Sequence, residues 1–148
     1  MPKVLLDTTA YVDLERIPKQ LHKPWAVNTM RHAAAYALEH GRPYLSTLTP
    51  IEIARGYEQE LNPAKLQIFN RDIVPTFQII GFDLQAACLA GEIYAKLERT
   101  RQRIGIPDTS IAAIAPQEGF SVVTSNTGHF QRIVNLGYPL QLENWREA

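Results

Sequence analysis

Residues 3–7 read Lys3-Val4-Leu5-Leu6-Asp7, and this short segment is the clearest indication of the fold. Its apolar residues follow one another without polar alternation, which is typical of a strand buried on both faces of a sheet. Such strands occur in parallel sheets that are covered by helices. The segment ends in an aspartate, so we expect a carboxylate at the carboxyl end of a buried strand.

The rest of the chain alternates in the way that a parallel sheet requires. Further strands are predicted at 43–47, 77–82, 120–124 and 140–142. Helices are predicted at 9–14, 24–40, 49–57, 83–103 and 107–119, with another that begins at Asn62-Pro63. Parallel neighbours need crossover connections, so this order predicts a mostly parallel sheet with helices on its faces. We expect a single α/β domain over residues 1–148, because this length suits one core.

The composition of the chain limits the classes of protein to which it can belong. Hydrophobic residues make up 45% of the chain and charged residues 20%, as in ordinary globular proteins. No apolar run approaches the roughly 20 residues of a membrane span, and the first residues lack the layout of a signal peptide. The single cysteine, Cys88, cannot form an internal disulfide, and its alanine-rich surroundings predict that it is buried. These features predict a cytoplasmic protein without membrane association.

Four polar positions are expected to share one edge of the sheet. Asp7 follows the first strand, and Asn126 ends the corner 124–126 after the fourth. Glu52 and Asp108 stand at helix starts. In parallel α/β domains ligands bind beyond the carboxyl ends of the strands, where the following helices also begin. Several carboxylate and amide oxygens at one edge repel one another unless a cation lies among them, and Mg²⁺ prefers such oxygens.

Each of these residues also has a local structural interpretation. Glu52 completes a Thr-x-x-Glu capping box with Thr49, and Pro50 suits the first helical position. Asp108 after Pro107 is typical of an N-cap. The aspartate and the asparagine that follow strands are typical turn residues.

No zinc site or covalent nucleophile competes with the oxygen-rich edge. The four histidines lack zinc-type spacing, and no Ser/His or Cys/His pair is evident. His129 alone lies near the proposed edge. The others are expected at the surface or at helix ends: His22, His32 and His40.

Four segments of the chain resemble the motifs of the PIN-domain family, specifically the VapC/FitB-like ribonuclease toxins of type II toxin–antitoxin systems. They are residues 4–9, 49–56, 104–113 and 122–130, and residues 143–145 resemble the family's closing strand. The resemblance implies a PIN-like three-layer α/β/α domain and a ribonuclease that hydrolyses RNA phosphodiester bonds. It also implies Mg²⁺ or Mn²⁺ as cofactor, a cognate antitoxin protein as partner, and a homodimer.

The same resemblance assigns roles to the polar edge. Asp7, Glu52 and Asp108 match the family's metal-binding acids, and these three with Asn126 form the implied catalytic set. At Asn126 the family often has a fourth acid. Thr8 and Thr124 match positions near the site where the family has hydroxyl residues. Thr9 stands where the family has a second small polar residue after the first Asp-Thr.

RNA binding requires local basic charge, because the formal net charge of the chain is zero. Lys96, Arg99 and Arg103 are spaced to share one face of the predicted helix 83–103. The alternative is a solvated face on which Glu92 pairs with Lys96. Two further arginines are expected nearby, Arg55 and Arg101.

The antitoxin is expected to contact the helices 9–14 and 24–40. Their apolar residues Tyr11, Trp25 and Tyr36 look exposed in the sequence pattern and suit a helix-in-groove contact. The alternative is ordinary packing of these rings into the core.

Two other function classes remain open. A phosphatase of the haloacid-dehalogenase type also has an aspartate after its first strand, and Asp7-x-Thr9 is faintly similar to that motif. Such an enzyme needs an acidic pair after a later strand, where this chain has Thr124-Ser125-Asn126. A catalytically silent PIN-fold binding module is the other alternative, and the set of three acids argues against it.

Overall fold

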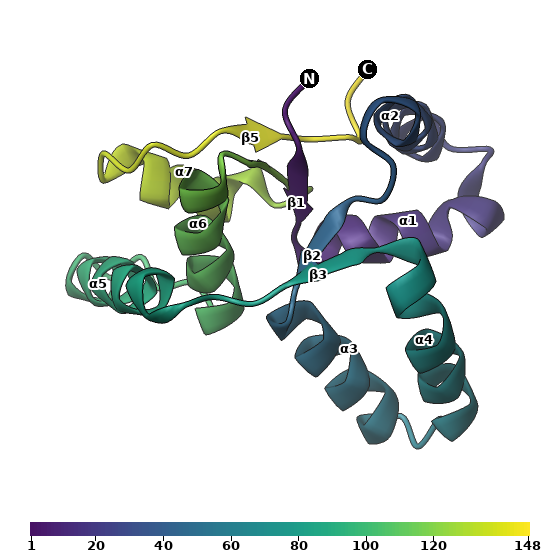
Figure 1. Ribbon diagram of the computed structural model, residues 1–148, viewed down its shortest axis with the longest axis horizontal. Helices are drawn as coiled ribbons and strands as arrows, with labels where there is room; N and C mark the ends of the chain where they lie inside the picture. The colour runs from purple at the N-terminus through teal and green to yellow at the C-terminus, as the bar shows by residue number, and fades with distance from the viewer.

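Five short parallel strands form one sheet at the centre of the computed structural model, which describes residues 1–148 (Figure 1). Their order across the sheet is β3 (Gln78–Ile80), β2 (Tyr44–Ser46), β1 (Val4–Leu6), β4 (Ser121–Val123) and β5 (Leu142–Glu143). Every neighbouring pair is parallel. The predicted parallel sheet is therefore confirmed, with the segment that indicated the fold as its middle strand.

Seven helices connect these strands. They are α1 (Thr8–Gln20), α2 (Pro24–His40), α3 (Leu48–Gln59), α4 (Pro63–Thr76), α5 (Leu84–Arg99), α6 (Ile106–Glu118) and α7 (Thr127–Asn135). None of the seven has the length and apolar character needed to span a bilayer. Three differ from prediction: α1 continues past 14, α5 ends before 103, and α7 was not predicted. The end of α5 is fixed by Arg101, whose φ of 56° is left-handed.

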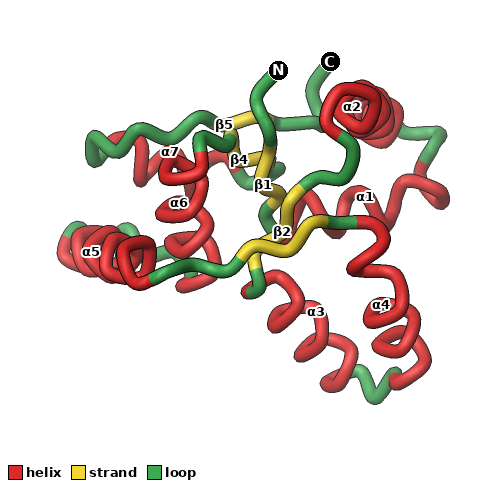
Figure 2. Tube along the Cα trace, in the orientation of Figure 1, coloured by secondary structure: helices red, strands yellow, loops and turns green.

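The two faces of the sheet are covered by different helices. Leu5 points into a cluster with residues of α5, α6 and α7, whereas Val4 and Leu6 point into a second cluster with residues of α1, α2 and α4. Figure 1 shows these two groups of helices on opposite sides of the strands, and Figure 2 shows the yellow strands between the red helices. This arrangement is the predicted three-layer α/β/α architecture.

Cys88 is exposed, so the prediction that it is buried is wrong. The buried stripe of α5 consists of Ala86, Ala90, Ile93 and Leu97, as predicted. Cys88 lies two residues from the first of these, which places it about 200° around the helix from Ala86.

Replacement of Leu5 by alanine should destabilise the protein by about 2–5 kcal/mol, because Leu5 is fully buried in the middle strand. Leu38→Ala is the matched control, since Leu38 is 91% exposed on α2 and should change stability by less than about 0.5 kcal/mol. Urea unfolding of the two variants measures the difference. Equal losses would contradict the placement of Leu5 in the core.

Candidate active site

Asp7 stands where β1 ends and α1 begins, and its side chain is almost completely buried. One carboxylate oxygen accepts hydrogen bonds from the Ala10 amide at 2.8 Å and from Thr9 Oγ1 at 2.6 Å. The other accepts from Thr124 Oγ1 at 2.5 Å. Asp7 is thus the N-cap of α1, and its carboxylate is also fixed by a residue that follows β4.

The corner after β4 lies beside Asp7, as the sequence predicted. The Ser125 amide donates to Thr9 Oγ1 at 3.1 Å, and the Asn126 amide donates to Thr124 Oγ1 at 2.9 Å. Asn126 is the N-cap of α7, but its side chain makes no capping hydrogen bond. The side-chain amide of Asn126 is therefore not used by the helix that it begins.

Glu52 is directed toward α1 instead of capping α3. Its carboxylate accepts a hydrogen bond from Thr8 Oγ1 at 2.5 Å, and Thr8 Oγ1 is 3.3 Å from Thr49 Oγ1. The alternative capping box is wrong, because the N-cap of α3 is Thr47, two residues before Thr49. The helix begins early where the Leu48 amide donates to Ser46 Oγ.

Asp108 is not an N-cap, because that position of α6 belongs to Gly105. The Asp108 carboxylate is 3.3 Å from His129 Nδ1, in the first turn of α7. The expected position of His129 near the edge is confirmed, but its contact with Asp108 was not predicted. The helix α7 could have been predicted from the spacing of its buried residues Phe130 and Ile133, which was overlooked.

Burial makes both aspartates harder to ionise. It raises the pKa of Asp7 from 3.8 to about 6, against the hydrogen bonds from Thr124, Thr9 and Ala10. The negative charge of Asp108 raises the Asp7 pKa further. Burial also raises the pKa of Asp108, and His129 opposes that effect. The two carboxylates therefore interact across the edge of the sheet, and their joint charge is unfavourable without a cation.

The donor set fits a hard divalent cation. Its polar groups are carboxylate, hydroxyl and amide oxygens, and Mg²⁺ is usually held by one or two carboxylates together with water and substrate phosphates. No three or more His, Cys, Asp or Glu side chains lie together as a complete metal cage. Asp7 and Asp108 are the pair that fits such an ion, while Glu52 is engaged by Thr8.

The predicted basic face of α5 is only partly present. Arg103 lies beyond the end of the helix and pairs with Glu98 at 3.0 Å. Lys96 lies over the Tyr138 ring at 5.0 Å, and Glu92 accepts from the Tyr138 hydroxyl, so the alternative Glu92–Lys96 ion pair is not formed. Arg55 is exposed and makes no ion pair with the acids of the site.

A family model for the PIN domain matches residues 4–136. The chain belongs to the PIN-domain family. Over 146 residues it is 28% identical to the tRNA(fMet)-specific endonuclease VapC of Salmonella typhimurium, covering 98% of this chain and 99% of the relative. Over 105 residues it is 30% identical to ribonuclease VapC2 of Haemophilus influenzae, covering 71% and 76% of the two chains.

Solved structures also share this fold. A chain of DNA-bound VapBC from Salmonella typhimurium has a TM-score of 0.72 at 28% identity, covering 98% of this chain and 99% of that chain. A chain of FitAcB from Neisseria gonorrhoeae has a TM-score of 0.68 at 25% identity, with the same two coverages. The recognised resemblance to the PIN-domain family is thus confirmed over nearly the whole chain.

The metal-free protein should lose stability as the pH rises from about 4 to about 6. Asp7 has a raised pKa, so in this range the folded protein still holds a proton that the unfolded chain has released. The free energy of unfolding falls as that proton is lost, and the rise in pKa from 3.8 to about 6 corresponds to about 3 kcal/mol. Asp7→Asn should remove this part of the pH dependence. Urea unfolding in EDTA across the range measures it, and parallel curves for the two proteins would count against it.

Proposed function

We propose that this PIN-domain protein is a divalent-metal-dependent endoribonuclease that hydrolyses RNA phosphodiester bonds. The observation that carries the proposal is the pairing of the buried Asp7 with the half-buried Asp108, whose negative charge raises the Asp7 pKa and whose own pKa is raised as well. Carboxylates whose pKa values are raised by burial and by a charged neighbour are typical of functional sites. The names of the relatives, an endonuclease and a ribonuclease, support the same reaction.

Each residue of the site has a distinct part in this proposal. A divalent cation held by Asp7 and Asp108 would supply positive charge to stabilise the phosphodiester during hydrolysis. Thr9 and Thr124 fix the direction of the Asp7 carboxylate, and His129 lies against that of Asp108. We assign the outer positions to Glu52, which the Thr8 hydroxyl orients, and to Asn126, whose side-chain amide is free to accept or donate.

Asp7→Asn and Asp108→Asn should each lower RNA cleavage by about 100-fold or more, because each removes one of the two charges at the centre. The fold should survive, because asparagine can replace Asp7 as the N-cap of α1 and because Asp108 does not cap α6. Asp83→Asn is the matched control: Asp83 caps α5 through the Ala86 amide at 2.9 Å, after the edge strand β3. Gel assays of RNA cleavage with Mg²⁺ compare the three. A folded Asp7 or Asp108 variant that cuts at the parent rate would refute the assignment.

A small phosphomonoester in the same assay tests the haloacid-dehalogenase alternative. In that reaction class the first aspartate acts as a nucleophile. Here the Asp7 carboxylate accepts three hydrogen bonds, and the corner after β4 supplies Thr124-Ser125-Asn126 in place of an acidic pair. We expect RNA cleavage without release of phosphate from the monoester. Release of phosphate without RNA cleavage would favour the phosphatase. The absence of both activities would favour the silent binding module.

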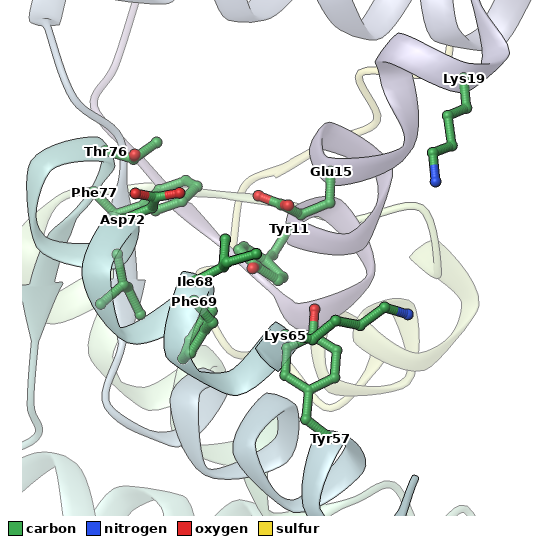
Figure 3. Close-up of a pocket in the computed structure, with 11 residues that line it drawn as sticks. Tyr11, Glu15, Lys19, Tyr57, Lys65, Ile68, Phe69, Asp72, Thr76 and Phe77 are labelled. Atoms are coloured by element: carbon green, nitrogen blue, oxygen red, sulfur yellow. The ribbon is translucent and has the colours of Figure 1, made fainter. Parts of the chain in front are cut away.

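We further propose that the protein is the toxin of a toxin–antitoxin pair, with an antitoxin bound over α1, α3 and α4. Tyr11 and Tyr36 are buried and Trp25 is half-buried, so the exposure predicted for these rings is wrong for the first two. An open pocket of about 280 Å³ lies instead beside Tyr11 and is lined by Tyr57 and Ile68 (Figure 3). A neighbouring pocket of about 300 Å³ shares Tyr11 and Tyr57. Apolar side chains of a partner helix would fit these two pockets.

Ile68→Glu should prevent co-purification with the protein encoded beside this chain, because Ile68 is 51% exposed in the pocket wall. Leu84→Glu is the control, since Leu84 is 80% exposed on α5, away from both pockets. Co-expression followed by affinity capture compares the two variants. If the parent chain captures no partner and causes no growth defect, the toxin assignment fails while the nuclease assignment stands.

A further inference from the structure

A pocket of about 280 Å³ opens next to the candidate active site, between the start of α1 and the end of the chain. Three hydroxyl side chains line it, together with two guanidinium groups, one carboxylate and one apolar side chain: Thr8, Thr9, Ser125, Arg16, Arg146, Asp13 and Val12. Hydroxyl and guanidinium donors around one recess are the groups that proteins use to bind phosphate. The composition of this pocket therefore differs from that of the acidic site beside it.

The pocket and the acidic site share the side chain of Thr9. Its hydroxyl donates to Asp7 Oδ1 at 2.6 Å and accepts from the Ser125 amide at 3.1 Å. Arg16 is on the same helix, seven residues after Thr9, which is two turns or about 10 Å along α1. Thr9 therefore connects the acidic site with the pocket that Arg16 lines.

The positive charge of one arginine is neutralised by a carboxylate, and that of the other is not. Arg146 donates to both oxygens of the buried Asp13, at 2.6 and 2.7 Å, so that pair is neutral. Arg16 forms no ion pair with any carboxylate, although Glu15 and Glu52 line the neighbouring pocket with it. Arg16 thus brings an uncompensated positive charge to a region with acidic neighbours.

Both guanidinium groups lie over the Trp25 ring. Arg16 lies 5.6 Å and Arg146 4.9 Å from the centre of this ring. Cation–π contacts of this kind orient a guanidinium without neutralising it. Arg16 is therefore held at the pocket with its hydrogen-bond donors available.

We propose that Arg16, with Arg146 and the pocket hydroxyls, binds a backbone phosphate of the RNA strand next to the phosphate that is cleaved. This proposal rests on the proposed ribonuclease function and assigns a position to its substrate. The acidic site repels a polyanion, and a cation beside it offsets that repulsion for the flanking phosphate. The sequence predicts RNA binding on the face of 83–103, but Arg103, beyond the end of α5, is engaged by Glu98, and Lys96 lies over the Tyr138 ring. Arg16 is a positioning residue in this scheme and takes no part in the chemical step.

The test compares Arg16→Gln with Arg99→Gln, which removes an exposed arginine from the α5 face. Binding of a single-stranded RNA oligonucleotide is measured by fluorescence anisotropy in EDTA, with gel analysis to confirm an intact strand. At about 50 mM salt, Arg16→Gln should weaken binding about five- to tenfold, and the slope of log K against log salt should fall by about 0.7. In cleavage assays with Mg²⁺ it should raise KM and leave kcat unchanged. Arg16→Lys should retain the salt slope, because the charge remains.

The outcomes separate this proposal from the function on which it rests. If the parent chain binds and cleaves RNA, but Arg16→Gln binds as the parent does or Arg99→Gln is the weaker variant, the Arg16 subsite is refuted and the ribonuclease stands. A fall in kcat with unchanged KM would also refute it. A parent chain that neither binds nor cleaves RNA would overturn both.

Discussion

The arrangement of the site depends on the hydrogen bonds that hold the buried carboxylate of Asp7. This group begins α1 by accepting from the Ala10 amide, and it ties α1 to the end of β4 by accepting from Thr124. Thr9 then links the carboxylate to the corner that begins α7. Burial raises the pKa of Asp7, and these hydrogen bonds offset only part of that effect, so the carboxylate remains electrostatically unsatisfied. A positively charged ligand would relieve that cost.

The sequence indicated the features that short-range physics determines. The middle strand was recognisable because it is apolar on both faces, and α2 was bounded correctly because Pro24 begins it and Gly41 follows it with a φ of 77°. The residues at the edge were found because chain direction places strand ends and helix starts together. The full extent of α1 was missed: the helix continues past Leu14 to Gln20 and contains Pro18, a residue type that is disfavoured in helix interiors.

The features that escaped prediction depend on contacts between distant segments. Whether Glu52 caps α3 or turns toward α1 is decided by Thr8, 44 residues earlier in the chain. The burial of Tyr11 depends on Phe69 and Phe77, which pack against its ring from α4 and the residue after it. The role of Arg146 near the site depends on Asp13, at the other end of the sequence. Periodicity along a chain shows only which face of a segment is apolar, so it carries no information on such pairs.

The pairing of β1 with β4 also has a consequence for the synthesis of the protein. Leu5 is paired with Val122, and the Asp7 carboxylate accepts from Thr124, 117 residues later. Chains are made from the N-terminus, and contacts between distant segments form late in folding. A nascent chain that has not yet extruded β4 from the ribosome therefore carries Asp7 but neither the partner strand nor the hydroxyl that fixes its carboxylate. Translation thus delays assembly of the site until most of the chain has been made.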